Sequence, residues 1–373
     1  MRVLYQSIPN THRRGIITSS CGMAARRKRT NSLHQGGDWE YNTLFIIGGG
    51  LKLPALNIGR LTARVPLIQG GMSVRVSTSS LASAVAECGG IGTIGGSGVP
   101  IGDLKDDIRK AKRMTKGIIA VNIMFAIREF MEAVKASIDA GVDMIVTGAG
   151  FSRDIFKIGK EHGIPIVSIV SSPEFGKLAE RSGADAIVVE AKEAGGHLGT
   201  DRPLRELFPE VRKVVKKVPL IAAGGISDGF EIGEMMSKYG ADGVQMATRF
   251  VLTKECDVSD AFKQTYLNAR QEDVLLMESP VGLPGRAIRN RFLNRLQAGE
   301  SVYDGECKRN CLKHCSHSFC IIDRLDMSRE GNVEDGLVFS GENVWKLTDI
   351  PSVRELIDRL VAEAESVYAP IPA

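Results

Sequence analysis

Eight short apolar runs rich in Val and Ile recur between residues 66 and 250, and segments with helical periodicity separate them. Continuous apolar strands that alternate with helices predict a parallel sheet that is covered on both faces. Eight such units in succession match a (β/α)8 TIM barrel. The runs are PLIQGG (66–71), IGTIGG (91–96), IIAVNIMF (118–125), MIVTGAG (144–150), IPIVSIV (164–170), AIVVEA (186–191), PLIAAGG (219–225) and GVQMATRF (243–250).

The competing α/β fold is a doubly wound sheet, which usually has fewer strands and a G-x-G-x-x-G turn after its first strand. The turn after the first run here reads QGGMSV and does not fit that pattern. We therefore predict an α/β chain, a TIM barrel followed by a C-terminal helical extension that contains cysteines.

The ends of the chain differ from the barrel region. Residues 1–50 carry HRRG and ARRKRTNS without a sustained period, which fits either an organelle transit peptide or a disordered extension. We favour the extension, because a domain start appears abruptly at LKLPALNIGR. The barrel is predicted over residues 51–295, with 280–292 as a loop that leads into a helix. Residues 296–373 are predicted to form a cysteine-rich segment and a closing amphipathic helix packed on the barrel.

Charge and composition exclude several classes of protein. Residues 1–37 hold seven basic residues and no acid, which leaves 48 − 7 = 41 bases against 44 acids in the remainder. A nearly neutral body argues against a nucleic-acid-binding protein. No apolar run approaches the ~20 residues of a membrane span, and seven cysteines, four of them within 307–320, do not form a disulfide framework. We expect a cytoplasmic protein.

Glycines gather at the carboxyl ends of the predicted strands, the face where TIM barrels place their active sites. Ordinary turns could explain any single pair, but several pairs on one face indicate a ligand that lies against the backbone. AAGGISDG after the seventh run and QMATRF in the eighth occupy the common phosphate site of such barrels. We expect the Thr248 hydroxyl to add a donor there and Arg249 to add charge nearby. The backbone amides predicted to converge on the phosphate are those of Gly224, Gly225, Ala247 and Thr248.

Taken in order, PLIQGGMS, VNIMF, IVTGAG, EAGGHLG, IAAGGI and GVQMATRF resemble the nitronate monooxygenase (2-nitropropane dioxygenase) family, which includes flavin-dependent enoyl-ACP reductases. The resemblance implies an FMN-dependent barrel. It implies that the flavin ring contacts Gly71, Met72 and Ser73, with Asn122 close by and Gly195 and Gly196 at its edge. It also implies that the ribityl phosphate is held by Gly225, Gln245, Met246, Ala247 and Thr248. Ser73 and Arg75 stand where the family often has glycine, and Arg75 could line the site or point outward.

His197 lies between Gly195-Gly196 and Gly199, just after the sixth predicted strand, so we expect it over the barrel mouth. A loop histidine without a role is the plain alternative. The resemblance implies an active-site base or anion partner. Neutral imidazole, with an unperturbed pKa of about 6.5, can remove a proton next to a nitro group, and its cation could steady a nitronate. His162 is expected at a helix end near the opposite face.

Cys307, Cys311, Cys315 and Cys320 have spacings of four, four and five. A helix would place the first three on one face, where thiolates could bind zinc or an iron–sulfur cluster. No C-x-x-C pair is present, and cysteine also packs as a small apolar residue. We predict no metal site.

Three functions remain in view. The leading hypothesis is FMN-dependent oxidation of alkyl nitronates with O2, in which His197 handles the proton or the anion and Arg75 assists. The alternative is an NAD(P)H-dependent flavin reductase, such as an enoyl-ACP or quinone reductase. The third is a non-catalytic barrel that binds a phosphorylated ligand. The sequence does not determine the oligomeric state and is compatible with a homodimer.

Overall fold

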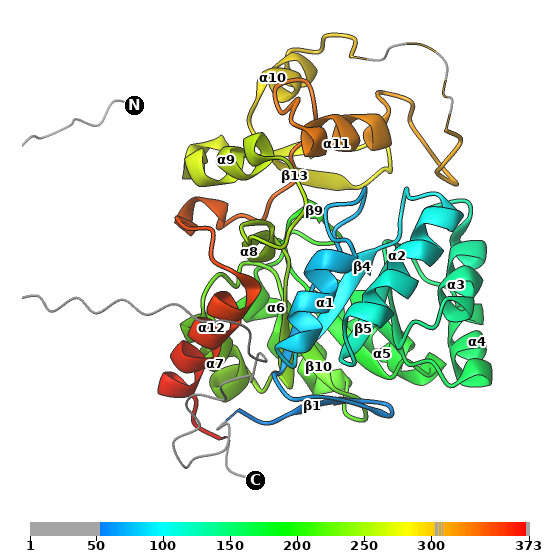
Figure 1. The fold of residues 1–373 in the computed structure, drawn as a ribbon, viewed down its shortest axis with the longest axis vertical. Helices are drawn as coiled ribbons and strands as arrows, with labels where there is room; N and C mark the ends of the chain where they lie inside the picture. The colour runs from blue at the N-terminus through cyan, green and yellow to red at the C-terminus, as the bar shows by residue number, and fades with distance from the viewer. Residues whose placement is uncertain (1–52, 303–304, 306, 308, 371–373) are drawn as a thin grey trace, which may run out of the picture. The chain divides into compact units, whose positions relative to one another are not determined.

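The computed structural model describes residues 53–302, 305, 307 and 309–370. Its centre is a closed barrel of eight parallel strands, so the predicted (β/α)8 fold is confirmed (Figure 1). Each predicted apolar run contributes one strand, and β8 pairs with β10 while β11 pairs with β3 to close the ring. In barrel order the strands are β3 (Leu67–Gln69), β4 (Ile91–Gly95), β5 (Ile118–Met124), β6 (Met144–Gly148), β7 (Ile166–Val170), β8 (Ala186–Glu190), β10 (Leu220–Ala223) and β11 (Gly243–Met246).

Helices follow the strands and cover the outside of the barrel. Gly163, Gly183 and Gly240 end three of them in the left-handed conformation, which glycine adopts without steric cost. His162 is the last residue of one of these helices, as predicted. The barrel helices are α1 (Ser79–Glu87), α2 (Ile101–Met114), α3 (Phe130–Asp139), α4 (Asp154–His162), α5 (Pro173–Ser182), α6 (Leu204–Val214), α7 (Gly229–Tyr239) and the short α8 (Thr248–Val251).

An antiparallel hairpin closes the barrel at the amino-terminal ends of its strands. It consists of β1 (Leu56–Ile58) and β2 (Leu61–Ala63). Leu56 and Ile58 are buried in one cluster with inward-facing residues of the barrel strands, such as Ile68. The amino-terminal ends of the strands are therefore closed, and the opposite ends carry the site.

A second antiparallel sheet lies above the carboxyl ends of the strands (Figure 1). β12 (Val274–Glu278) and β13 (Pro284–Ile288) form a hairpin, and β13 also pairs with β9 (Gly196–His197). The prediction of a loop at 280–292 was wrong in this part. Its residues become a strand because they pair with segments both near and far in sequence, which a local pattern does not reveal.

One helix precedes this hairpin and three follow it. α9 (Asp260–Asn268) precedes the hairpin, and α10 (Arg291–Gln297), α11 (Ile321–Glu330) and α12 (Val353–Val367) follow it. α12 is the expected amphipathic closing helix, and it begins with a capping box between Ser352 and Glu355. It packs on α7 so closely that a Cβ at Gly229 would lie 2.1 Å from the Leu360 carbonyl oxygen.

Two further sequence-based expectations concern regions outside these elements. The extension predicted over residues 1–50 lies outside the described residues. Among its described residues, the stretch that contains Cys307, Cys311 and Cys315 has no helix, so the helical geometry that would align these three thiols on one face is not found there. Within the described ranges, no helix is long and apolar enough to cross a membrane.

Candidate active site

Two adjoining hollows lie at the carboxyl ends of the barrel strands. The larger is a cavity of about 450 Å³ and the smaller a cleft of about 70 Å³. Glu190, Gln245 and Thr248 are among the residues that line both. All thirteen predicted site residues line one or the other, and the cleft contains Gly224, Gly225 and Met246 while the cavity contains Gly71, Met72, Ser73, Asn122, Gly195, Gly196, His197, Gln245, Ala247 and Thr248.

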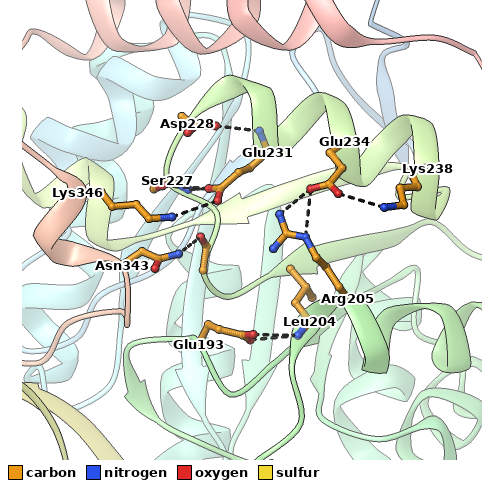
Figure 2. Close-up of polar contacts among 11 residues, drawn as sticks. Glu193, Leu204, Arg205, Ser227, Asp228, Glu231, Glu234, Lys238, Asn343 and Lys346 are labelled. Carbon is orange, nitrogen blue, oxygen red and sulfur yellow. Dashed lines mark hydrogen bonds and ion pairs between the residues drawn. The ribbon is translucent and has the colours of Figure 1, made fainter. Parts of the chain in front are cut away.

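The cleft has the geometry of an anion site. Gly224 and Gly225 form a turn in which both residues have positive φ values, 104° and 76°, and successive backbone N–H groups in a turn can form a concavity that binds anions. A Cβ at Gly225 would lie 2.9 Å from the Glu193 Cβ. Asn343 fixes the turn, because its Nδ2 donates to the Gly225 carbonyl at 2.6 Å (Figure 2).

Thr248 completes the cleft at the start of α8, where first-turn amides have no partner within the helix. Its Oγ1 accepts a hydrogen bond of 2.8 Å from the Gly341 amide, so the hydroxyl proton remains available for a ligand. Met246 is only 2% exposed and takes part through its backbone.

The cation expected at the cleft, the guanidinium of Arg249, is already paired with other residues. Arg249 is buried, and its Nη2 lies 2.6 Å from Asp349 Oδ1. Its Nη1 donates to the carbonyls of Leu252 and Asp349. Arg249 lines the cleft, but its charge is paired with Asp349, and the other donors of the cleft are neutral amides and a hydroxyl.

The floor of the cavity contains an acceptor without a donor. Asn122 Nδ2 donates to the Gly71 carbonyl at 3.3 Å, whereas its buried Oδ1 has no partner. Such an atom loses its hydration on folding and is costly to leave unpaired. Close packing requires the neighbouring glycine, since a Cβ at Gly71 would lie 2.5 Å from the Asn122 Cβ. A flat ring that presents an N–H group fits this floor.

The loop after β3 shows why the family often has glycine there. Val74 and Arg75 adopt φ values of 53° and 62°, which side chains rarely favour. The Arg75 side chain turns toward α2, where its Nη atoms lie 4.0 Å from Asp103 and 3.9 Å from Asp107. Arg75 does not line the cavity, so the hypothesis that it assists the reaction is not supported by its position.

His197 reaches the cavity from β9, which places it opposite Gly285 of β13. Its Nε2 lies 2.8 Å from the Ser279 Oγ. The Phe339 ring packs edge-on against it, with ring centroids 5.2 Å apart. Burial lowers the pKa of His197 to about 4, because an imidazolium is poorly solvated there. The imidazole is therefore neutral at neutral pH.

Arg286 holds the loop that leads to β9, and the sequence analysis missed it. This buried residue of β13 donates from Nε to the Ala194 carbonyl at 3.2 Å and from Nη2 to the Lys192 carbonyl. It also forms an ion pair of 3.6 Å with Glu342. No local motif marks this role, because the loop, the strand and the acid are far apart in the sequence.

Glu190 is a second residue that was missed. It ends β8 and lines both hollows, and no other described residue donates a hydrogen bond or lends a positive charge to its side chain. Burial raises its pKa to about 7. A polar residue at the carboxyl end of a barrel strand is a recognisable signal, so AIVVEA could have revealed it.

The segment that contains the cysteines contributes to the wall of the cavity. Its described residues form no group of side chains that could hold a metal ion. Cys311 and Leu312 line the cavity, and Leu312 forms an antiparallel bridge with Ile127 after β5. In the part of the chain that the structure describes, no three His, Cys, Asp or Glu side chains are grouped to hold a metal ion. The described cysteines are free thiols.

Comparison with known proteins agrees with this geometry. The family model described as nitronate monooxygenase matches residues 56–138 and 118–363. The chain belongs to the nitronate monooxygenase family. The resemblance noted in the sequence is thus confirmed, and the chain is a flavin-dependent oxidoreductase of this family.

Its relatives carry several names. The chain is 28% identical to (3aS,4S,5R,7aS)-5-hydroxy-7a-methyl-1-oxo-octahydro-1H-indene-4-carboxyl-CoA dehydrogenase of Mycobacterium tuberculosis, over 80% of this chain and 92% of that protein. It is 25% identical to a probable nitronate monooxygenase of Staphylococcus saprophyticus, over 85% and 99%. The structure of FabK from Thermotoga maritima matches with a TM-score of 0.71 and 28% identity, over 83% and 94%. Nitroalkane oxidase from Streptomyces ansochromogenes shares the fold, with a TM-score of 0.70 at 22% identity, over 81% and 96%.

Proposed function

We propose that this protein catalyses FMN-dependent oxidation of alkyl nitronates, and of the nitroalkanes that give rise to them, with O2 as the electron acceptor. The observation that carries the proposal is a neutral, half-buried imidazole that faces a glycine-lined cavity. The family match supports the chemistry.

FMN is the flavin that fits the two hollows. The cleft of neutral donors at Gly225 and Thr248 suits its phosphate, because backbone amides and a hydroxyl can surround an anion without a cation. The unpaired Asn122 Oδ1 suits an N–H group of the ring. Glu190 and Gln245 lie where the hollows meet, beside the chain that would join ring to phosphate. When bound, the flavin supplies the acceptor for two electrons from the substrate.

Of the two roles considered for His197, the geometry favours the base. An imidazole whose pKa is near 4 is uncharged at neutral pH, so it offers no positive charge to bind a nitronate. If Nε2 carries the ring proton and donates it to Ser279, the lone pair of Nδ1 is free to take a proton. His197 would thus remove the acidic proton next to the nitro group, and the anion would form inside the site.

The proposal can be tested with purified protein loaded with FMN. We expect oxygen consumption with 2-nitropropane, and a strong loss of its turnover in His197→Ala. An absorption spectrum taken first would establish flavin content. If the flavin is fully bound and 2-nitropropane causes no oxygen consumption, the proposal is wrong.

A second candidate is an NAD(P)H-linked reductase or dehydrogenase that acts on an acyl thioester. The observation in its favour is the largely apolar wall of the cavity, together with the CoA thioester in the name of the mycobacterial relative. Rapid bleaching of the flavin by NADH or NADPH under argon, without oxygen consumption in the presence of nitro compounds, would favour this candidate.

A further inference from the structure

The floor and the roof of the cavity differ in polarity. The floor consists of strand ends and carries the amides and polar side chains described above. The roof comes from segments that follow the barrel in sequence, and it is mostly apolar, although Tyr266, Cys311, Ser328 and Ser340 also line the cavity. Its apolar members include Val281 and Leu283 of the hairpin turn, Leu312, and Ile321, Ile322 and Leu325 of α11.

Backbone contacts hold this roof in place. The Arg128 amide donates to the Cys311 carbonyl, and the Lys313 amide donates to the Ala126 carbonyl, each at 2.9 Å. These bonds flank the bridge between Ile127 and Leu312. The roof is therefore a fixed wall of the site, joined to the loop after β5.

The cavity offers no charge to a ligand. No described residue that lines it is Lys or Arg. Its ionisable residues are Glu190, His197, Tyr266 and Cys311. Burial raises the pKa of Glu190, Tyr266 and Cys311 and lowers the pKa of His197. All four are thereby shifted toward their uncharged forms, and an anion that enters loses its hydration without a cationic partner.

We propose that the site selects an uncharged substrate with an extended apolar body, and that Leu312, Ile322 and Leu325 determine this specificity. The inference rests on the proposed function, because it places the substrate over the flavin beside His197. The substrate enters as a neutral carbon acid, and its anion forms only at the base. The apolar body can belong to a nitroalkane or to an acyl thioester.

Binding of unreactive amides tests the proposal without any turnover. Butanamide, octanamide and octanoate would be titrated by calorimetry into protein saturated with FMN. We expect affinity to rise about fourfold per added methylene, since each buried methylene contributes a nearly constant free energy. We expect octanoate to bind at least about tenfold more weakly than octanamide.

A pair of variants assigns the effect to the roof. Leu312→Arg places a cation in the wall and should reverse the preference, so that octanoate binds more tightly than octanamide. Leu296→Arg makes the same change on α10, where the residue does not line the cavity, and should leave the preference unaltered. A thermal melt of each variant shows whether it is folded, and Leu312→Gln serves if the arginine is not tolerated, with weaker octanamide binding expected.

The outcomes separate this inference from the proposed function. Affinities independent of chain length, or octanoate binding as tightly as octanamide, would overturn the inference even if nitro compounds are oxidised. A length-dependent preference for the amides would support it even if they are not. Two further assays then distinguish the two sources of the apolar body. Oxygen consumption with 1-nitrooctane would indicate a nitroalkane. Bleaching of the flavin by octanoyl-N-acetylcysteamine in the absence of oxygen would indicate an acyl thioester.

Discussion

The floor and the roof of the active site are built in different ways. The floor is made mainly of turns that directly follow barrel strands, although Asn343 and Gly341 from the C-terminal part of the chain bond to Gly225 and Thr248. The roof and the wall that carries His197 are built from β9, the β12–β13 hairpin, α11 and Phe339, which are distant from one another in the sequence. The difference teaches that cofactor binding and substrate handling can be altered separately in this protein, and four predictions test that separation.

The largest effect is expected at His197. His197→Ala should lower kcat/KM for 2-nitropropane by roughly 10²–10⁴-fold, the usual contribution of a positioned base, while FMN content stays unchanged. Steady-state oxygen consumption and flavin absorbance measure the two quantities. His162→Ala, at the end of α4, is the control. Loss of FMN together with activity in His197→Ala would show that roof and floor are coupled.

Arg286→Met should destabilise the wall that carries His197. The change leaves two carbonyls of the loop and the partly exposed Glu342 without their partner, and a buried acceptor left unpaired costs about 1–3 kcal/mol. Denaturant unfolding should show this loss, and activity should fall more than FMN affinity. Arg289→Met removes an exposed arginine just beyond the same strand and should behave like the unaltered protein. Equal stability of the two variants would contradict the conclusion that Arg286 holds the loop that leads to β9.

Thr248→Val tests the floor, and it also removes the acceptor of the Gly341 amide. Loss of one hydroxyl donor to a dianion is worth about 1.5–3 kcal/mol, so FMN affinity should fall roughly tenfold or more. Affinity for riboflavin, which lacks the phosphate, should hardly change. Fluorescence titration of flavin-free protein measures both. If the two ligands are weakened equally, the cleft does not hold the phosphate.

The smallest effect is a shift in titration. Because burial lowers the pKa of His197 to about 4, its imidazole should stay neutral as the pH falls from 7 to 5. The unfolded chain takes up that proton near pH 6.5, so this residue's contribution to stability decreases as the pH falls from 6.5 toward 4. NMR of ring nitrogens, assigned with His197→Ala, checks the midpoint. A titration midpoint of His197 near 6.5 would mean that the wall around its imidazole does not exclude water.

Sequence patterns predicted the floor more completely than the wall. Gly224, Gly225 and Thr248 could be placed because a strand and its turn are contiguous, and strand order then brings the turns together. Arg249 shows the limit of the same reasoning, since its partner Asp349 lies 100 residues away. Arg286 and Ser279 were missed because their roles exist only once β13 pairs with β9.

The amino-acid sequence alone determined the barrel, since eight apolar runs with helical spacers have few other ways to bury their strands. It also determined which face carries the glycines and the histidine. Only the tertiary structure decided that the histidine sits on a second sheet, stays uncharged beside Ser279 and Phe339, and faces an apolar roof. These features depend on the burial of groups by residues far along the chain, and burial is a property of packing that local sequence does not encode.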